Sequence, residues 1–163
     1  MGATTTAAEL GRAFPDVPVV DSSGAHVRDS VDSDPRLVVA TPGAEPAPES
    51  GYACAVILDA VSSLSRPGLA AVEQTVDRWM AILALVRSVR DGGRAVVVGP
   101  SEDAALQAMV RNDPAGWAAR ELTDRREARF PPAVPCGIVD GDPKAVASAA
   151  QRLGEWFGTD LEV

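Results

Sequence analysis

Two short apolar runs decide the fold: Tyr52-Ala53-Cys54-Ala55-Val56-Ile57-Leu58 and Arg94-Ala95-Val96-Val97-Val98-Gly99. Each is rich in β-branched residues and bounded by turn residues, which predicts a buried strand. Between them the apolar residues recur in steps of three and four, which predicts a helix that Gly92 and Gly93 end. Its apolar face comprises Leu69, Val72, Val76, Trp79, Leu83 and Val86. A strand, a helix and a strand in this order indicate a parallel pair of strands.

The same alternation continues outward from this segment in both directions. Before it we predict a helix over 5–14, strands over 17–20 and 36–40, and loops over 21–34 and 41–51. After it we predict helices over 102–110, 113–128 and 143–157, a strand over 135–139 and the start of another at 160–163. The fold class is therefore α/β, with a parallel sheet buried on both faces. A new strand beginning at the last residues predicts truncation near Val163.

Composition limits the function. The 163 residues carry a net charge of −8, with 15 basic and 23 acidic residues, so the bulk field will not attract DNA. The two cysteines and the one histidine cannot build a zinc site. We expect Cys54 to be a buried thiol, in a reduced cytoplasmic compartment. No signal peptide and no membrane-length apolar run is found, so no membrane partner is expected.

One local basic patch stands out, formed by Arg120, Arg125, Arg126 and Arg129. It could contact DNA, or it could be a salt-bridged solvent face, since Arg120–Asp124 and Glu121–Arg125 are spaced to pair along a helix. The three tryptophans could stack on bases, but we expect core packing for all three. They are Trp79, Trp117 and Trp156.

Three stretches in series carry a family resemblance. They are Glu9-Leu10-Gly11-Arg12-Ala13-Phe14-Pro15, then Leu37-Val38-Val39-Ala40-Thr41-Pro42-Gly43-Ala44-Glu45-Pro46 with the strand ending at Asp59-Ala60, then the helix 119–127 with Phe130-Pro131-Pro132. This order resembles the PriA replication-restart helicase family, in the actinobacterial form whose helicase motifs are degraded.

The resemblance implies a P-loop NTPase-type, RecA-like second helicase lobe over 1–100. It also implies connecting helices over 101–130 and the start of a truncated α+β C-terminal domain over 131–163. The family recognises abandoned replication forks, binds forked or single-stranded DNA and works with replisome and primosome proteins. Its active members are 3′-to-5′ DNA helicases that use ATP, and its zinc-binding insertion precedes the region present here. We therefore expect no cofactor in this chain.

The family's nucleotide motifs are altered in this chain. A Walker A loop needs Lys followed by Ser or Thr, and the only lysine, Lys144, precedes Ala145. Thr41 and Gly43 keep parts of one motif, although Pro42 removes a backbone donor. Arg87 and Arg90 are displaced from the motif arginines that contact phosphate, and could equally be a solvated helix end. These four are candidate cofactor-binding positions.

No catalytic or metal-binding residue is expected. Asp59 matches an acidic position of the family but serves equally well as a cap or turn residue. Three functions stay open: a DNA-binding part of a restart protein without ATP-driven unwinding, a non-catalytic protein scaffold, and an unrelated α/β enzyme. The last lacks a GxSxG nucleophile elbow and has one histidine. Whether the chain is an enzyme is left open.

Overall fold

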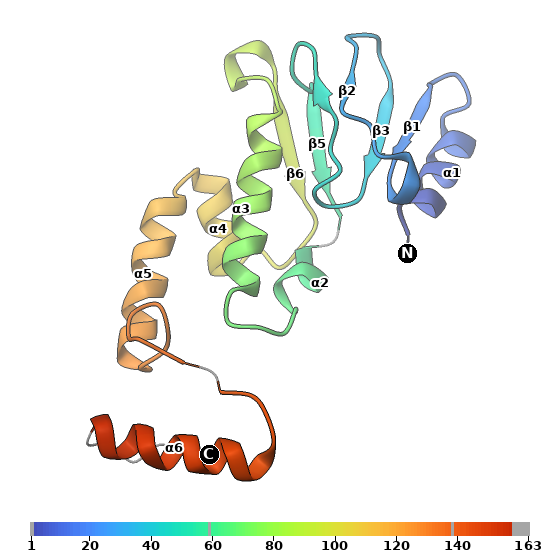
Figure 1. Ribbon diagram of the computed structural model, residues 1–163. Coiled ribbons are helices and arrows are strands. Elements are labelled where there is room, and N and C mark those ends of the chain that lie inside the picture. The colour runs from blue at the N-terminus through green and yellow to red at the C-terminus, as the bar shows by residue number, and fades with distance from the viewer. Residues whose placement is uncertain (1, 59, 138, 158–163) are drawn as a thin grey trace. The chain divides into compact units, whose positions relative to one another are not determined.

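The computed structural model describes residues 2–58, 60–137 and 139–157. The chain divides into two compact units, residues 1–118 and 119–163, and each is described by itself. Figure 1 shows the order of the elements, which form a mixed α/β fold with short parallel sheets.

Three parallel strand pairs make up the sheets of the first unit. In the first pair, β1 (Val19–Ser22) lies beside β3 (Leu37–Ala40). The short strands β2 (Ser30–Val31) and β4 (Ala47–Pro48) form the second pair. In the third pair β5 (Cys54–Ile57) lies beside β6 (Arg94–Val97). The predicted parallel pairing of the two deciding runs is confirmed.

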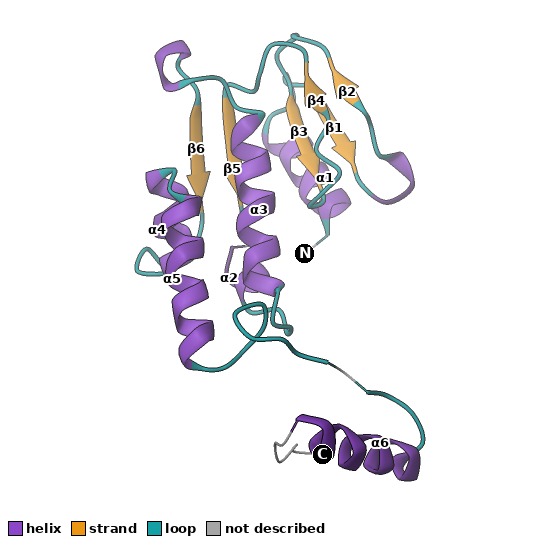
Figure 2. Ribbon diagram, turned by 60° about the vertical axis from the view of Figure 1, so that its left-hand side comes forward, coloured by secondary structure: helices purple, strands orange, loops and turns teal. Residues whose placement is uncertain are grey.

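Helices connect and cover these strands (Figure 2). In the first unit they are α1 (Ala3–Ala13), α2 (Ala60–Leu64), α3 (Ala71–Ala84) and α4 (Ala104–Arg111), with 3-10 turns η1 (Gly24–His26) and η2 (Val89–Asp91). Then come α5 (Pro114–Glu127), which begins in the first unit, and α6 (Pro143–Phe157) in the second. Each helix predicted from the sequence is present, with shifted ends.

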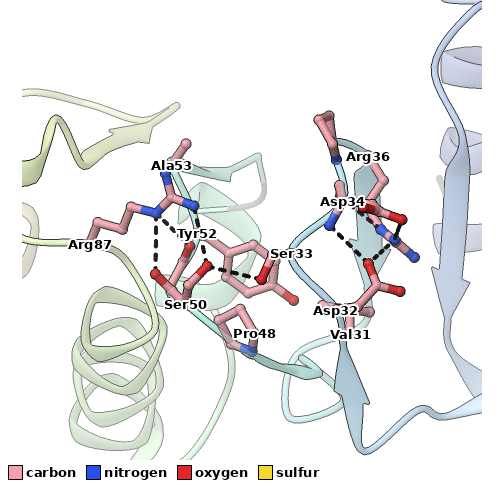
Figure 3. Close-up of a pocket in the computed structure, with 12 residues that line it drawn as sticks. Val31, Asp32, Ser33, Asp34, Arg36, Pro48, Ser50, Tyr52, Ala53 and Arg87 are labelled. Carbon is pink, nitrogen blue, oxygen red and sulfur yellow. Dashed lines mark hydrogen bonds and ion pairs between the residues drawn. The ribbon is translucent and has the colours of Figure 1, made fainter.

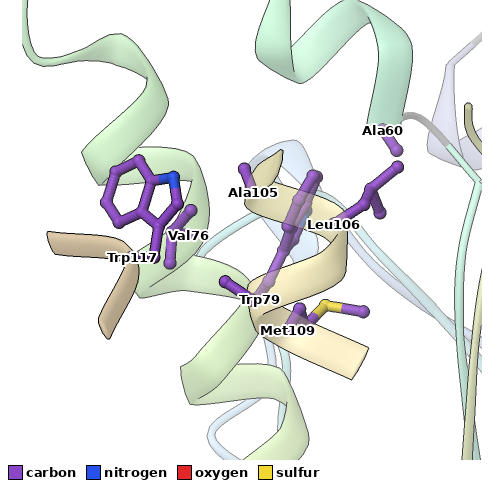
Figure 4. Packing of buried hydrophobic residues seen from close by; sticks show 8 residues of the cluster. Ala60, Val76, Trp79, Ala105, Leu106, Met109 and Trp117 are labelled. Carbon is purple, nitrogen blue, oxygen red and sulfur yellow. The ribbon is translucent and has the colours of Figure 1, made fainter. Parts of the chain in front are cut away.

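One apolar cluster holds α2, α3, α4 and the start of α5 together (Figure 4). Its largest members are two tryptophans, Trp79 of α3, 3% exposed, and Trp117 of α5, 7% exposed. Ile57 of β5 and Val97 of β6 pack against the cluster, so it also anchors the strand pair. The other buried members are Ala60, Val76, Ala105, Leu106, Ala108 and Met109. The expectation of core packing is thus confirmed for Trp79 and Trp117, and it is wrong for Trp156, which is 85% exposed.

Polar caps fix where α4 and α5 begin. The Asp103 carboxylate accepts hydrogen bonds from the amides of Ala105 (2.8 Å) and Leu106 (3.1 Å). Asp113 accepts from the Gly116 amide (2.8 Å), and Pro114 follows it in the first turn, as predicted. A Cβ on Gly116 would lie 2.1 Å from the Asp113 carboxylate, so a larger residue there would require the carboxylate to move. These two caps direct Met109 and Trp117 into the core.

The helix predicted up to Gly92 ends earlier, at Ala84. The Leu85 amide donates to the carbonyl of Ile82, which tightens the last turn of the helix. The Leu85 carbonyl accepts from the Tyr52 amide (2.8 Å). Val86 then forms a parallel β-bridge with Tyr52. Pairing with another strand thus replaces the helix that local periodicity predicts.

Other predictions fail or cannot be judged here. The described residues of 135–139 form no strand, and residues 160–163 lie outside the described residues. The short elements β2, β4 and α2 were not predicted, because each is too brief to show a period.

Burial of the sheet on both faces, and of the Cys54 thiol, was also predicted wrongly. Cys54 is exposed, and Val56 is 55% exposed. Alternate residues of β5 point to opposite faces, and only the face with Ile57 packs against the core. Apolar runs that look buried on both sides are therefore covered on one side in this chain.

Trp79 provides the first test of this packing. Truncating it should leave a large cavity, so Trp79→Ala should lower the free energy of unfolding by about 3–5 kcal/mol in urea titrations followed by circular dichroism. The matched control is Trp156→Ala, because Trp156 is 85% exposed and should change stability by less than about 0.5 kcal/mol. Equal midpoints for the two variants would refute this account of the core.

Candidate functional site

The loop that carries Thr41 and Gly43 is held at both ends by Ser22, through its side chain and its backbone carbonyl. Ser22, fully buried at the end of β1, donates from Oγ to the Ala44 carbonyl (2.7 Å). The same Oγ accepts from the Arg28 amide (3.0 Å), and the Ser22 carbonyl accepts from the Thr41 amide (3.3 Å). One buried serine therefore links β1 to two loops. Because a buried hydroxyl without partners is costly, this arrangement fixes the loop conformation.

The Glu45 carboxylate binds a backbone amide of this loop. Gly43, at φ +90°, donates its N–H to Oε2 of Glu45 at 2.9 Å. The Ala44 amide donates to the Thr41 carbonyl (2.9 Å), and Pro42 has no N–H to offer. The amides of Thr41, Gly43 and Ala44 therefore all donate to groups of the chain itself.

Tyr52 joins this loop to the segment after α3. Its hydroxyl donates to the buried Pro46 carbonyl at 2.8 Å, and its backbone carbonyl accepts from the Arg87 amide at 2.9 Å. Burial of the ring raises the pKa of the Tyr52 phenol above its ordinary value, and the nearby Glu45 carboxylate raises it further. The two segments with candidate cofactor-binding residues therefore meet through one tyrosine.

Arg87 lines a pocket of about 120 Å³ beside Tyr52 (Figure 3). Its Nε donates to the carbonyls of Gly51 (3.0 Å) and Ser50 (3.2 Å), and its Nη2 lies 3.5 Å from Ser50 Oγ. The guanidinium therefore binds the loop before β5. Neither Thr41 nor Gly43 is among the described residues that line this pocket.

The opposite wall of the pocket is acidic. Asp32 and Asp34 lie there, and both pair with Arg36. A hydrogen bond from the Asp34 amide, with a smaller effect of Arg36, lowers the pKa of the Asp32 carboxyl. The described lining of the pocket thus contains two carboxylates, both paired with Arg36, and a second guanidinium group, that of Arg87.

Two glycines allow the Arg87 backbone to lie this close. A Cβ on Gly93 would lie 1.9 Å from the Arg87 carbonyl oxygen, which no side chain tolerates. Gly51, at φ +79°, leaves only 3.0 Å between its ideal Cβ position and Arg87 Cγ. Gly93 was predicted to end a helix, and its function in the structure is this close approach instead.

The last candidate is Arg90, and Asp59 was a further residue considered from the sequence. Arg90 lies exposed in η2 and has no hydrogen bond or ion pair with any described residue. Asp59 lies outside the described residues.

The four candidate arginines of α5 and the residues after it differ sharply in environment. Arg125, whose side chain is 11% exposed, pairs with Glu121 (Nε–Oε1, 2.8 Å) and donates from Nη1 to the Pro131 carbonyl (2.8 Å). This confirms the predicted Glu121–Arg125 pair. Arg120 forms no ion pair with Asp124 among the described residues. Arg120, Arg126 and Arg129 are exposed.

Arg129 also ends the helix. It adopts φ 57°, and its amide donates to the Arg126 carbonyl (3.3 Å) while the Phe130 amide donates to the Arg125 carbonyl (2.8 Å). These two bonds form a Schellman motif, in which glycine is the usual residue at the left-handed position. Arg129 thus occupies a conformation that costs a residue with a Cβ about 1 kcal/mol or more.

Comparison with known proteins identifies the kind of protein from which this chain comes. A probable replication restart protein PriA of Mycobacterium leprae is 44% identical over 152 residues, which cover 93% of this chain and 23% of that protein. The probable replication restart protein PriA of Mycobacterium tuberculosis (strain H37Rv) is 43% identical over 148 residues, covering 91% and 23%. The chain corresponds to part of a PriA-like protein. It spans about a quarter of the length of these relatives. No family model and no solved structure matches it.

Two of the candidate cofactor-binding residues of this PriA-like chain bind other groups of the chain. The Gly43 amide binds Glu45, and Arg87 binds two carbonyls, so two of the four candidates already have intramolecular partners. The described residues also include no group of three or more His, Cys, Asp or Glu side chains that could hold a metal ion. None of the described helices has the length and apolar character needed to cross a bilayer.

Sequence reasoning missed the residues that hold this region together: Ser22, Glu45 and Tyr52. Tyr52 is the only tyrosine, which is the one signal that could have drawn attention to it. Ser22 lies in a stretch rich in Ser, Asp and Gly, where nothing in the pattern marks one hydroxyl as buried.

Tyr52 offers a direct titration because it is the only tyrosine in the PriA-like chain. Its phenol should ionise above its ordinary value of 10.0 in the folded protein, as seen by ultraviolet absorbance of tyrosinate. A raised folded pKa stabilises the fold below the unfolded value, and this contribution is lost as the pH rises through the folded pKa.

The controls for this titration separate the two causes. Unfolding in urea should return the midpoint to its ordinary value, and Glu45→Gln should lower it by the smaller share that the carboxylate contributes. Tyr52→Phe should abolish the signal. An identical midpoint with and without urea would contradict the burial of the ring.

Arg129→Gly should stabilise the end of α5. Relief of the left-handed strain should contribute about 1 kcal/mol, which corresponds to about fivefold slower amide exchange of Phe130. Arg129→Ala keeps a Cβ, so its exchange rate should match that of the unchanged chain. If alanine slows exchange as much as glycine does, backbone conformation is not the cause.

Proposed function

We propose that this chain acts within a replication-restart protein that binds forked or single-stranded DNA and assists reloading of the replicative machinery. The observation that carries the proposal is the 44% identity over 93% of the chain to a protein named for replication restart. The name of that relative supports a role in replication restart. DNA binding by these residues, and contact with primosome proteins, are our own extension.

Within this proposal, residues 1–100 are a RecA-like second helicase lobe. Its support is the parallel pairing of β1 with β3 and of β5 with β6, with α3 between the last two strands. Crossover helices between parallel strands are the building units of such lobes.

We further propose that this segment does not bind or hydrolyse ATP. In support, the Gly43 amide donates to Glu45 and the Arg87 guanidinium donates to Ser50 and Gly51. Both groups would have to exchange these partners for phosphate oxygens before they could bind a nucleotide.

The exposed arginines of α5 and its C-terminal end are the proposed DNA contact. Arg120, Arg126 and Arg129 are available to phosphates, whereas Arg125 is committed to Glu121 and Pro131. Three cations on a chain of net charge −8 give weak binding, with dissociation constants on the order of 10⁻⁴ M or weaker at physiological salt.

A scaffold for protein partners is the second candidate function. The net charge of −8 favours it, because like charge repels the DNA backbone from most of the surface. In that case the DNA-binding residues of a PriA-like protein lie outside this segment.

Fluorescence anisotropy of a labelled forked DNA, titrated with the chain over a salt series, decides between the two. We expect measurable binding at low salt that is lost in the triple variant R120A/R126A/R129A, with the slope against log salt reduced by up to about 3. The matched control R28A/R66A/R78A removes the same charge from exposed arginines of the first unit and should retain that slope.

Two results would contradict the DNA contact. If both triple variants weaken binding equally, the effect is one of net charge and not of a site. If the unchanged chain does not bind even at low salt, these residues act as a scaffold, and the second candidate replaces the first.

A further inference from the structure

One exposed aromatic ring is preceded in the chain by two exposed arginines at the C-terminal end of α5. Phe130 is 49% exposed, and it directly follows Arg129 in the turn after the helix (Figure 1). Arg126, four residues before Phe130 in the last turn of α5, is also exposed. Neither arginine forms an ion pair with any described residue, so both guanidinium groups are available to an external anion. We name Arg126, Arg129 and Phe130 the turn site.

Hydrogen bonds on both sides of Phe130 fix its backbone. Its amide donates to the Arg125 carbonyl (2.8 Å), and its carbonyl accepts from the Val134 amide (3.2 Å). The Arg125 side chain adds a second tie, because its Nη1 donates to the Pro131 carbonyl (2.8 Å) and its Nε to Oε1 of Glu121 (2.8 Å). The turn is therefore ordered before any ligand arrives. A ring on an ordered backbone loses little conformational freedom when it binds a ligand.

The charge around Phe130 distinguishes it from an ordinary exposed apolar residue. Phe14 is 50% exposed, and single exposed rings of this kind are common on protein surfaces. Phe14 is followed two residues later by an acid, Asp16. By contrast, the stretch from residue 128 to residue 139 contains Arg129 as its only charged residue. No carboxylate of that stretch therefore opposes an anion that approaches the ring of Phe130.

An aromatic ring close in the chain to two free guanidinium groups fits single-stranded DNA better than duplex DNA. The bases of a duplex are stacked on one another, so their faces are closed to a ring on a protein surface. The bases of a single strand can stack on such a ring, whatever their sequence. Arginine binds the phosphate oxygens that flank the base. Single-stranded DNA therefore uses both the ring and the cations of the turn site, whereas a duplex uses the cations alone.

We infer that Phe130 stacks on an unpaired base while Arg126 and Arg129 bind the phosphates on either side of it, so that the turn site selects single-stranded over duplex DNA. This inference rests on the proposed DNA contact of α5 and its C-terminal end, and it adds the class of DNA that is bound. Arg125 has a separate role as a positioning residue, because its bonds to Glu121 and Pro131 hold the turn that carries the ring.

Fluorescence anisotropy with two DNA probes tests the inference at low salt. The probes are a labelled oligothymidylate of about 16 nucleotides and a duplex of the same length. The unchanged chain should bind the single strand more tightly than the duplex. Phe130→Ala should weaken binding of the single strand about fivefold or more and leave binding of the duplex unchanged. Because this variant loses no charge, the slope of its affinity against log salt should stay the same.

Matched variants separate stacking from folding and from charge. Phe14→Ala removes an equally exposed ring and should leave binding of the single strand unchanged. Phe130→Leu keeps an apolar side chain in the turn but removes the aromatic ring, so it should weaken binding as alanine does, whereas Phe130→Trp should retain it. The circular dichroism spectrum of each variant should match that of the unchanged chain. R126A/R129A should reduce the salt slope for the single strand by about 1.4, for two phosphate contacts.

Three outcomes overturn the inference, and they identify what has failed. If the chain binds the single strand and both Phe130→Ala and Phe130→Leu bind it equally tightly, the ring does not stack on a base, although the proposed DNA contact stands. Equal affinity of the unchanged chain for both probes means that the turn site reads phosphates alone. If the chain binds neither probe at low salt, the proposed DNA contact itself fails, and the inference fails with it.

Discussion

Parallel pairing of β5 with β6 requires a long connection between the two strands, and the rest of the first unit is arranged around that connection. Two parallel strands cannot be joined by a tight turn, because the chain must return to the starting end of the sheet. The helix α3 makes this return, and its buried side chains Val76 and Trp79 hold it against the strands through the core cluster. The caps at Asp103 and Asp113 then turn α4 and α5 so that they close the same cluster.

Most of the regular elements could be predicted because each carries its own local pattern. The β-branched runs around Val38, Val56 and Val96 and the three-and-four spacing through Val76 are properties of short windows of sequence. The elements that could not be predicted depend on distant partners. The end of α3 at Ala84 follows from the pairing of Val86 with Tyr52, which no local window contains.

The candidate site was less predictable, for a related reason. A family motif gives the positions of Thr41, Gly43 and Arg87, but their chemistry depends on which groups they bind. The Gly43 amide binds Glu45, and Arg87 binds the carbonyls of Ser50 and Gly51, so the fold gives these candidate positions partners that the motif alone does not reveal. Likewise, sequence spacing alone predicted that Arg125 could pair with Glu121. The hydrogen bond from Arg125 to the Pro131 carbonyl could be found only from the folded structure.

The close approach at Gly93 has a consequence for the gene as well as for the protein. Every amino acid that a single-base change in a glycine codon can introduce carries a Cβ, and a Cβ there would lie 1.9 Å from the Arg87 carbonyl oxygen. No amino acid that a single-base change can introduce is therefore sterically neutral at this position. Purifying selection should hold this codon to its synonymous alternatives, whereas an exposed position such as Val89 can drift.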